Sequence, residues 1–273
     1  RKNIIVMAMS TLKPEVKKYK FTWKDWEECY PYYSQLAPTS QMIQIREGSL
    51  DKVIILATSA VLKTQTVQCD GKEITTTAVD FYLNEMGIDK NENGNRYEIV
   101  TMDDDSLTLA TARTVDIIRK FWKENEEEKK LWIDTQGGFR GVGLVINAVI
   151  SLLKADEIQP SGVYAMNFNG KVGELQHIQD QTNIYKIFDF VSGINEFSRY
   201  GRAEQLEDYY RSVSDTKDVP EVIKCMKSIT ESIQMCDMVG FENNLKELRK
   251  LVKEPEDKND LLNIFWNQIK EDY

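Results

Sequence analysis

The sequence predicts an α/β protein with a Rossmann-like parallel sheet flanked by helices, followed by a helical extension. Short apolar runs of strand length alternate with longer segments of helical period, which is the pattern of parallel strands joined by crossover helices. After about Val191 the strand signal disappears and only helical segments follow. With 273 residues, the chain is long enough for a core of about 150 to 200 residues plus such an extension.

Five expected strands and four expected helices make up the core. The strands are Ile4–Met9, Val53–Thr58, Tyr97–Thr101, Leu131–Thr135 and Gly162–Phe168. Helical spacing marks the segments between them, which are Ser34–Glu47, Thr75–Met86, Leu107–Lys123 and Arg140–Leu153. Four more helical segments follow, which are Glu204–Ser212, Glu221–Met235, Asn243–Lys253 and Leu261–Ile269. We therefore expect one domain over residues 1–205 and a helical extension over residues 206–273.

The amino-acid composition limits the classes of binding partner that we expect for this chain. The chain has 35 Lys and Arg against 44 Asp and Glu, so duplex nucleic acid is disfavoured and an anionic ligand needs a local basic pocket. No CxxC pair occurs, which argues against a zinc ribbon or a disulfide framework and favours a reducing cytoplasm; the cysteines are Cys29, Cys69, Cys225 and Cys236. No stretch approaches the roughly 20 apolar residues of a membrane span. We expect no metal, no cofactor and no membrane contact in this segment.

Small polar residues stand at the ends of the expected strands. In an open parallel sheet, ligands bind in the crevice beyond the carboxyl ends of the strands, so these residues should converge at one edge. They are Ser10, Thr11 and Lys13 after the first strand, Thr58 and Ser59 at the second, Thr135, Gln136, Gly137, Gly138 and Arg140 at the fourth, and Asn167, Asn169 and Lys171 at the fifth.

The turn after the fourth strand is the most informative of these segments. Gly137 and Gly138 would let a ligand approach the backbone, and the free N–H groups at the following helix start favour an anion. Arg140 would sit in the first helical turn, where a cation is unfavourable to the helix dipole unless an anion binds there. The alternative is a tight turn capped by Thr135 or Asp134, with Arg140 pairing a surface carboxylate, and the spacing leaves both open.

Other signatures are absent or weak. Neither GxGxxG nor a P-loop occurs, which disfavours a dinucleotide enzyme and a P-loop NTPase. The run Asp103–Asp105 could ligate a metal, but it precedes a helix, so capping is favoured. His177 is the only histidine, and Leu175 and Ile178 beside it suggest a partly packed position. We therefore name no catalytic residue.

A family resemblance rests on the same turn. The segment Leu131-Trp132-Ile133-Asp134-Thr135-Gln136-Gly137-Gly138-Phe139-Arg140 resembles the D-x-T-x-G-x-R segment of CRISPR-associated CARF proteins, in the branch with the form DxTHGFR. Gly162–Phe168 resembles the next strand of that branch, Ile194–Gly201 its F-x-x-Y-G helix, and Ile54–Ala60 its second strand. The resemblance covers about the first 205 residues. It departs at Gln136 and Gly137, where the branch has Thr and His, and in the first loop.

The resemblance implies a cytoplasmic CARF domain of a type III CRISPR antiviral effector. Such domains bind cyclic oligoadenylate across a homodimer interface, where a two-fold axis presents each contact twice. Because of the departures, the ring size stays open between cyclic tetra- and hexa-adenylate. The implied ligand-binding residues are Ser10, Thr11, Lys13, Thr58, Ser59, Thr135, Gln136, Gly137, Gly138, Arg140 and Asn167.

Three functions remain open from the sequence. A sensor domain that controls an effector domain outside this chain is favoured. A metal-independent ring nuclease that cleaves the cyclic ligand is the first alternative, because a positioned ribose 2′-hydroxyl can attack the next phosphate. An unrelated Rossmann-like enzyme or a transcription regulator is the second. A HEPN ribonuclease signature cannot be formed, because it requires a His on a helix and His177 lies before the helical tail.

Overall fold

The computed structural model describes residues 1–23, 30–33, 36–92, 95–103, 106–138, 141–167, 171, 173–213, 218–253 and 261. The chain forms two compact units, Arg1–Thr182 and Asn183–Tyr273. The boundary expected from the sequence, after residue 205, lies inside the second unit.

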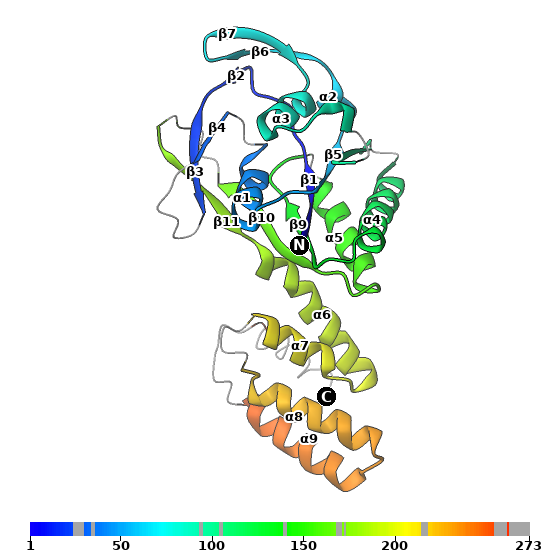
Figure 1. Ribbon diagram of the computed structural model, residues 1–273. Coiled ribbons are helices and arrows are strands. Elements are labelled where there is room, and N and C mark those ends of the chain that lie inside the picture. Colours follow the sequence, from blue (N-terminus) through cyan, green and yellow to red (C-terminus); the bar gives the residue numbers. More distant parts are fainter. Residues whose placement is uncertain are drawn as a thin grey trace. The chain divides into compact units, whose positions relative to one another are not determined.

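An eight-stranded sheet forms the centre of the first unit (Figure 1). Its parallel part consists of β10 (Pro160–Asn167), β9 (Lys129–Asp134), β1 (Lys2–Ala8), β5 (Lys52–Ala57) and β8 (Tyr97–Thr101), in that spatial order. These are the five strands that the sequence predicts, each within two residues of the expected bounds. The fold class, an α/β protein with a mostly parallel sheet flanked by helices and a helical C-terminal region, is confirmed.

The central parallel strands β1 and β5 are buried on both faces. Ile5 and Met7 of β1 pack in one cluster with residues of α1 (Pro38–Glu47) and α3 (Ala78–Met86). Ile4 points to the opposite face and is fully buried as well. Two helices that pack against each other, α4 (Leu107–Glu124) and α5 (Val142–Lys154), have apolar faces that we assign to this opposite face of the sheet. Burial on both faces explains why these strands read as continuous apolar runs.

Two sets of shorter strands are missing from the sequence prediction. The main sheet continues beyond β10 with β11 (Leu175–Asp180), which is antiparallel to β10, then β3 (Tyr19–Trp23) and β4 (Tyr30–Tyr32). A separate three-stranded sheet contains β2 (Glu15–Val16), β6 (Gln65–Cys69) and β7 (Lys72–Thr76). The expected purely parallel sheet is therefore a mixed one. These strands are short and partly exposed, so they lack the apolar runs that mark the central strands.

Two helix starts also differ from expectation. Thr75 and Thr76, expected in a helix, belong to β7, and α3 begins only after Thr77, whose side chain accepts a hydrogen bond from the Asp80 N–H at 3.0 Å. The helix expected from residue 34 begins at Pro38, because proline is favoured in the first turn. The described residues of this unit also include two short helices, α2 (Ser59–Leu62) and the 3₁₀ turn η1 (Lys90–Glu92).

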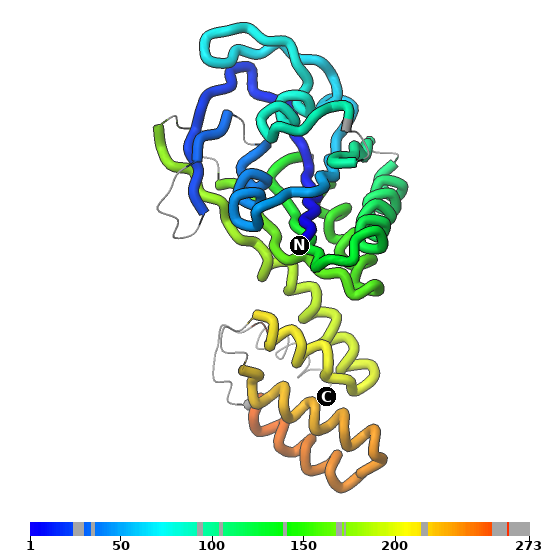
Figure 2. Tube along the Cα trace, viewed as in Figure 1, coloured from blue at the N-terminus to red at the C-terminus, as the bar shows by residue number. Residues whose placement is uncertain are grey.

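The described part of the second unit is helical (Figure 2). Its helices are α6 (Thr182–Tyr200, which begins in the first unit), α7 (Glu204–Val213), α8 (Glu221–Gln234) and α9 (Met238–Lys253). Their apolar faces form one core that includes Phe190, Leu206, Ile223 and Met226. The last three correspond to expected helices, whereas the N-terminal part of α6 was not foreseen. The expected helix Leu261–Ile269 lies outside the described residues except for Leu261. No described helix has both the length and the apolar character needed to cross a bilayer.

Candidate functional site at the carboxyl edge of the parallel sheet

The strand order places a topological switch point between β1 and β9. From β1 the chain continues to β5 and β8 on one side, and then crosses to β9 and β10 on the other. At such a point the loops leaving two adjacent strands diverge, which opens a crevice at their carboxyl ends. The residues after β1 and β9 flank this crevice, so the sequence-based choice of edge agrees with the topology.

The turn after β9 packs directly on the end of β1. A Cβ atom added to Gly137 would overlap the carbonyl group of Ala8. Gly138 has a φ of 93°, and an added Cβ would lie 2.9 Å from the Ala8 Cβ atom. Both positions therefore require glycine for the chain's own packing. From the sequence we expect these glycines to let a ligand approach the backbone; in the structure they also let the turn after β9 pack on the end of β1.

Asp134 is buried beneath this turn. Its side chain is 2% exposed, and Oδ1 accepts a hydrogen bond from the Gln136 N–H at 2.8 Å. Burial raises the pKa of the Asp134 carboxyl to about 6, although the Gln136 N–H partly counteracts this effect. The capping of the turn by Asp134, one of the alternatives considered from the sequence, is confirmed.

Thr135 and Gln136 bind neighbouring strands of the same unit. The Thr135 hydroxyl donates to Gln181 Oε1 at 2.8 Å, and the Thr135 N–H donates to the Tyr164 carbonyl at 2.9 Å. Gln136 Oε1 accepts from the Met166 N–H at 3.2 Å. These contacts fix the turn against β10 and the end of β11. Gln181 was not anticipated, because only the three-dimensional pairing of β10 with β11 brings it to the turn.

The ends of β5 and β8 are joined by a second polar contact. Thr58 directly follows β5 in the N-cap position of α2, and Ser59 donates its hydroxyl to Asp103 Oδ1 at 2.5 Å. The hydrogen bonds from Ser59 hold the pKa of the Asp103 carboxyl below its usual range. Asp103 Oδ1 also accepts the Ser59 N–H at 3.2 Å, so this carboxylate caps the start of α2. Asp104 and Asp105 lie outside the described residues, so capping of the helix that follows them stays a prediction. No group of acidic, His or Cys side chains in the described ranges could hold a metal ion.

The loop after β1 is anchored to the small sheet. Ser10 is half-buried, and Thr11 and Lys13 are exposed. Between them, the Leu12 N–H donates to Gln65 Oε1 at 3.1 Å, an anchor that the sequence did not reveal. The loop thus leads from the edge toward β2 and β6.

The far side of the edge is exposed. Asn167 ends β10 opposite His177 of β11, and both residues are exposed, so the partly packed position expected for His177 is wrong. Lys171 pairs with Glu174 at 3.2 Å. Arg140 and Asn169 lie outside the described residues, and their roles stay predictions.

Together these contacts define a class of protein. The chain is an α/β protein with a doubly wound, mostly parallel sheet whose switch point carries a candidate ligand-binding edge. The structure brings Ser10, Thr58 and the turn 135–138 to that one edge, because each lies within two residues of the end of a neighbouring parallel strand. The bonds seen there are structural ones within the chain, and ligand binding at these residues stays a prediction.

Comparisons with known proteins add one structural likeness. No protein-family model matches the chain, and no curated protein matches it. One similar solved structure is Enterococcus italicus Csm6 bound to cyclic hexa-2′-fluoro-hexa-dAMP, with a TM-score of 0.44 and 12% sequence identity over 99% of this chain. The chain spans 62% of the length of that protein.

Proposed function

We propose that this chain is a CARF-type sensor domain that binds cyclic tetra- or hexa-adenylate in the cytoplasm at a homodimer interface. Ligand binding then controls an effector domain outside this chain. The observation that carries the proposal is the turn after β9, which resembles the D-x-T-x-G-x-R segment and lies at the switch point of the parallel sheet.

The turn has the properties of a preorganised binding wall. Its backbone is held by packing on Ala8, by the buried Asp134 and by two side-chain contacts to β10 and β11. A backbone fixed in this way loses little conformational entropy when a ligand binds. Arg140 follows this turn two residues later in the sequence and supplies a cation for phosphate, which a chain of net charge -9 must provide locally.

Exposed leucines support the proposed dimer. Leu144 is 76% exposed in the first turn of α5, and Leu109 is 70% exposed in the first turn of α4. Because both helices begin just after parallel strands end, these side chains lie toward the carboxyl edge. Burying them against a second copy is favourable. A two-fold axis there would also complete a symmetric site for a cyclic ligand.

Calorimetry with cyclic tetra- and hexa-adenylate tests the proposal, followed by chromatography of the ligand. We expect tight binding of one of the two, with one ring per two chains. Arg140→Ala should weaken it by more than about tenfold, because a charge-assisted contact to phosphate is lost twice in a dimer. Lys171→Ala, at a 70% exposed side chain on the same edge, is the control and should change affinity little.

The possible outcomes separate the candidate functions. Absence of binding by both rings would refute the sensor function. Equal affinities for the parent, Arg140→Ala and Lys171→Ala would refute the proposed pocket. Slow conversion of the ligand to linear products in excess chelator would establish the ring nuclease instead of a pure sensor.

A further inference from the structure

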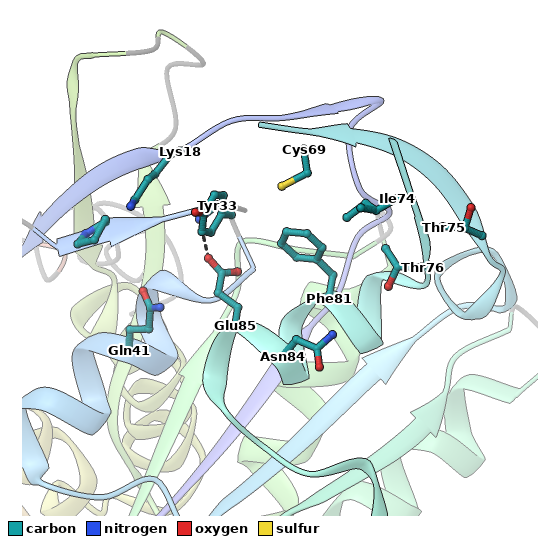
Figure 3. A pocket seen from close by; sticks show the side chains of 11 residues that line it. Lys18, Tyr33, Gln41, Cys69, Ile74, Thr75, Thr76, Phe81, Asn84 and Glu85 are labelled. Carbon is teal, nitrogen blue, oxygen red and sulfur yellow. Dashed lines mark hydrogen bonds between the residues drawn. The ribbon is translucent and has the colours of Figure 1, made fainter. Parts of the chain in front are cut away.

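Two features involve none of the residues predicted to bind the cyclic ligand: a cavity in the first unit and an apolar patch in the second. The cavity has a volume of about 660 Å³ and lies between α1, α3, the segment around Tyr33, and the β6–β7 hairpin (Figure 3). Phe81 gives it an apolar wall, but Asn84, Thr75 and Thr76 line it with donors and acceptors together. This mixed lining selects no class of ligand. The patch, in contrast, is bordered by charges that favour one kind of partner.

The patch lies at one end of the helical unit, where the α6–α7 turn packs on the last turns of α8 (Figure 1). The Thr230 hydroxyl donates to the Gly201 carbonyl at 2.6 Å, and a Cβ atom added to Gly201 would lie 2.6 Å from the Ile233 Cδ1 atom. The α8–α9 turn follows directly. Five apolar side chains here are between 45% and 71% exposed and form what we call the end patch: Tyr200, Ile233, Met235, Met238 and Val239.

The side chains of the end patch contribute little to the core of their own unit. Five of the twelve large apolar side chains that are exposed within the described residues belong to the end patch, so they are not scattered singly over the surface. Every residue from Ile233 to Val239 is exposed. Exposed apolar patches with a polar border mark contact sites, and the flexible side chain of Met adapts to the shape of a partner.

Charges of opposite sign border the end patch on its two sides. Arg202 lies in the α6–α7 turn with a side chain that is 62% exposed, and its distance to the Glu196 carboxylate is long, at 3.9 Å. Asp237 lies in the α8–α9 turn, and Glu242 follows one helical turn after Met238 on α9; both carboxylates are exposed. A two-fold axis through the patch would place the basic side of one copy against the acidic side of another. The end patch is therefore complementary to itself.

A lipid surface fits the end patch less well. Asp237 and Glu242 stand beside the apolar side chains, and moving a carboxylate into a bilayer is costly. Asp237 Oδ1 accepts the Gly240 N–H at 2.9 Å, so this carboxylate is held at the turn. A protein partner can satisfy such carboxylates with a cation, and Arg202 of a second copy is one.

We propose that the end patch is an interface between two copies of this chain. Apolar side chains from both copies are buried at its centre, which is favourable, and Arg202 of each copy faces the carboxylates of the other. Five side chains per copy make a small contact compared with the roughly 800 Å² per partner of a standard interface. We therefore expect weak self-association, at micromolar rather than nanomolar chain concentration.

Cys236 provides a direct probe of this contact. It is the one exposed cysteine within the described residues, and it lies between Met235 and Met238 in the sequence. A short bis-maleimide should therefore link two copies through Cys236 at tens of micromolar chain, and a denaturing gel should show a covalent dimer. Cys236→Ser should lose this product. A covalent dimer as abundant in Cys236→Ser as in the parent would contradict the proposed interface.

A matched pair of variants ties the contact to the end patch. Met238→Glu puts a carboxylate into the apolar contact from both copies, so the yield of covalent dimer should fall at least about tenfold. Folding should be kept, since Met238 is 68% exposed and begins α9, where an acid suits the helix dipole. Ile184→Glu is the control at an exposed position near the opposite end of α6, and it should crosslink as the parent does. Equal yields from Met238→Glu and the parent, at equal labelling by a monofunctional maleimide, would refute the interface.

Other occupants of the end patch give different results. If Cys236 of the parent does not react with a monofunctional maleimide, the chain itself covers the patch. If the parent floats with vesicles of phosphatidylcholine and phosphatidylglycerol and gives no covalent dimer, the patch binds lipid. Either result, or a reactive Cys236 without any covalent dimer, overturns the proposal. Because no cyclic ligand is present, these outcomes are independent of the proposed function.

Discussion

Replacing Asp134 with Asn should stabilise the protein at neutral pH and remove part of its pH dependence. The Asp134 carboxyl is buried, and its pKa is raised from 3.8 to about 6. The folded protein therefore holds this proton more tightly than the unfolded chain. The protonated Asp134 carboxyl therefore contributes to folding stability, and this contribution is complete below pH 3.8 and is lost as the pH rises through about 6.

The magnitude follows from the two pKa values. At 1.36 kcal/mol per pH unit, the ionised Asp134 carboxylate costs about 3 kcal/mol of folding free energy at pH 8 relative to the protonated form. About 1.4 kcal/mol of this loss of folding stability occurs between pH 5 and pH 8. Asn carries no charge at either pH, and its Oδ1 can still accept the Gln136 N–H. Asp134→Asn should therefore gain stability over the parent as the pH rises.

Urea denaturation at pH 5 and pH 8 measures this difference. Asp103→Asn is the control, because Asp103 is an exposed carboxyl whose pKa is lowered by Ser59, so its substitution should not stabilise the protein at pH 8. Asp134→Ala should lose stability relative to Asp134→Asn at both pH values, since the Gln136 N–H then lacks its partner. If Asp134→Asn and the parent show parallel pH profiles, the reasoning about this buried carboxyl is refuted.

Three further predictions concern the turn after β9, the expected dimer and the absence of RNA cleavage. Gly137→Ala should destabilise the first unit by more than about 2 kcal/mol, because the added Cβ overlaps the Ala8 carbonyl and the backbone must move. Chemical denaturation measures the loss of stability, and Gly143→Ala is the control because the space at its Cβ is open. Leu144→Glu should convert the expected dimer to a monomer at micromolar concentration in light scattering, and a parent that is itself monomeric would contradict the proposed interface. The purified chain should not cleave labelled RNA in excess chelator, and rapid cleavage would reveal an active site that the sequence does not show.

The sequence alone determined the central sheet and the edge that carries the candidate site. Strands such as β1 and β5 are buried on both faces, so their apolar runs stand out locally, and the helices between them repeat with helical period. Once the strands are known to be parallel, their carboxyl ends must share an edge. Placing Ser10, Thr58 and Thr135 together therefore needed no structure.

The tertiary structure decided what the local pattern does not encode. β3 and β11 contain exposed positions and lie far apart in the chain, so their pairing has no signal in either segment alone. Whether Gly137 makes room for a ligand or for Ala8 depends on where the end of β1 lies. Hydrophobic period reports burial along a segment, whereas these features arise from contacts between segments.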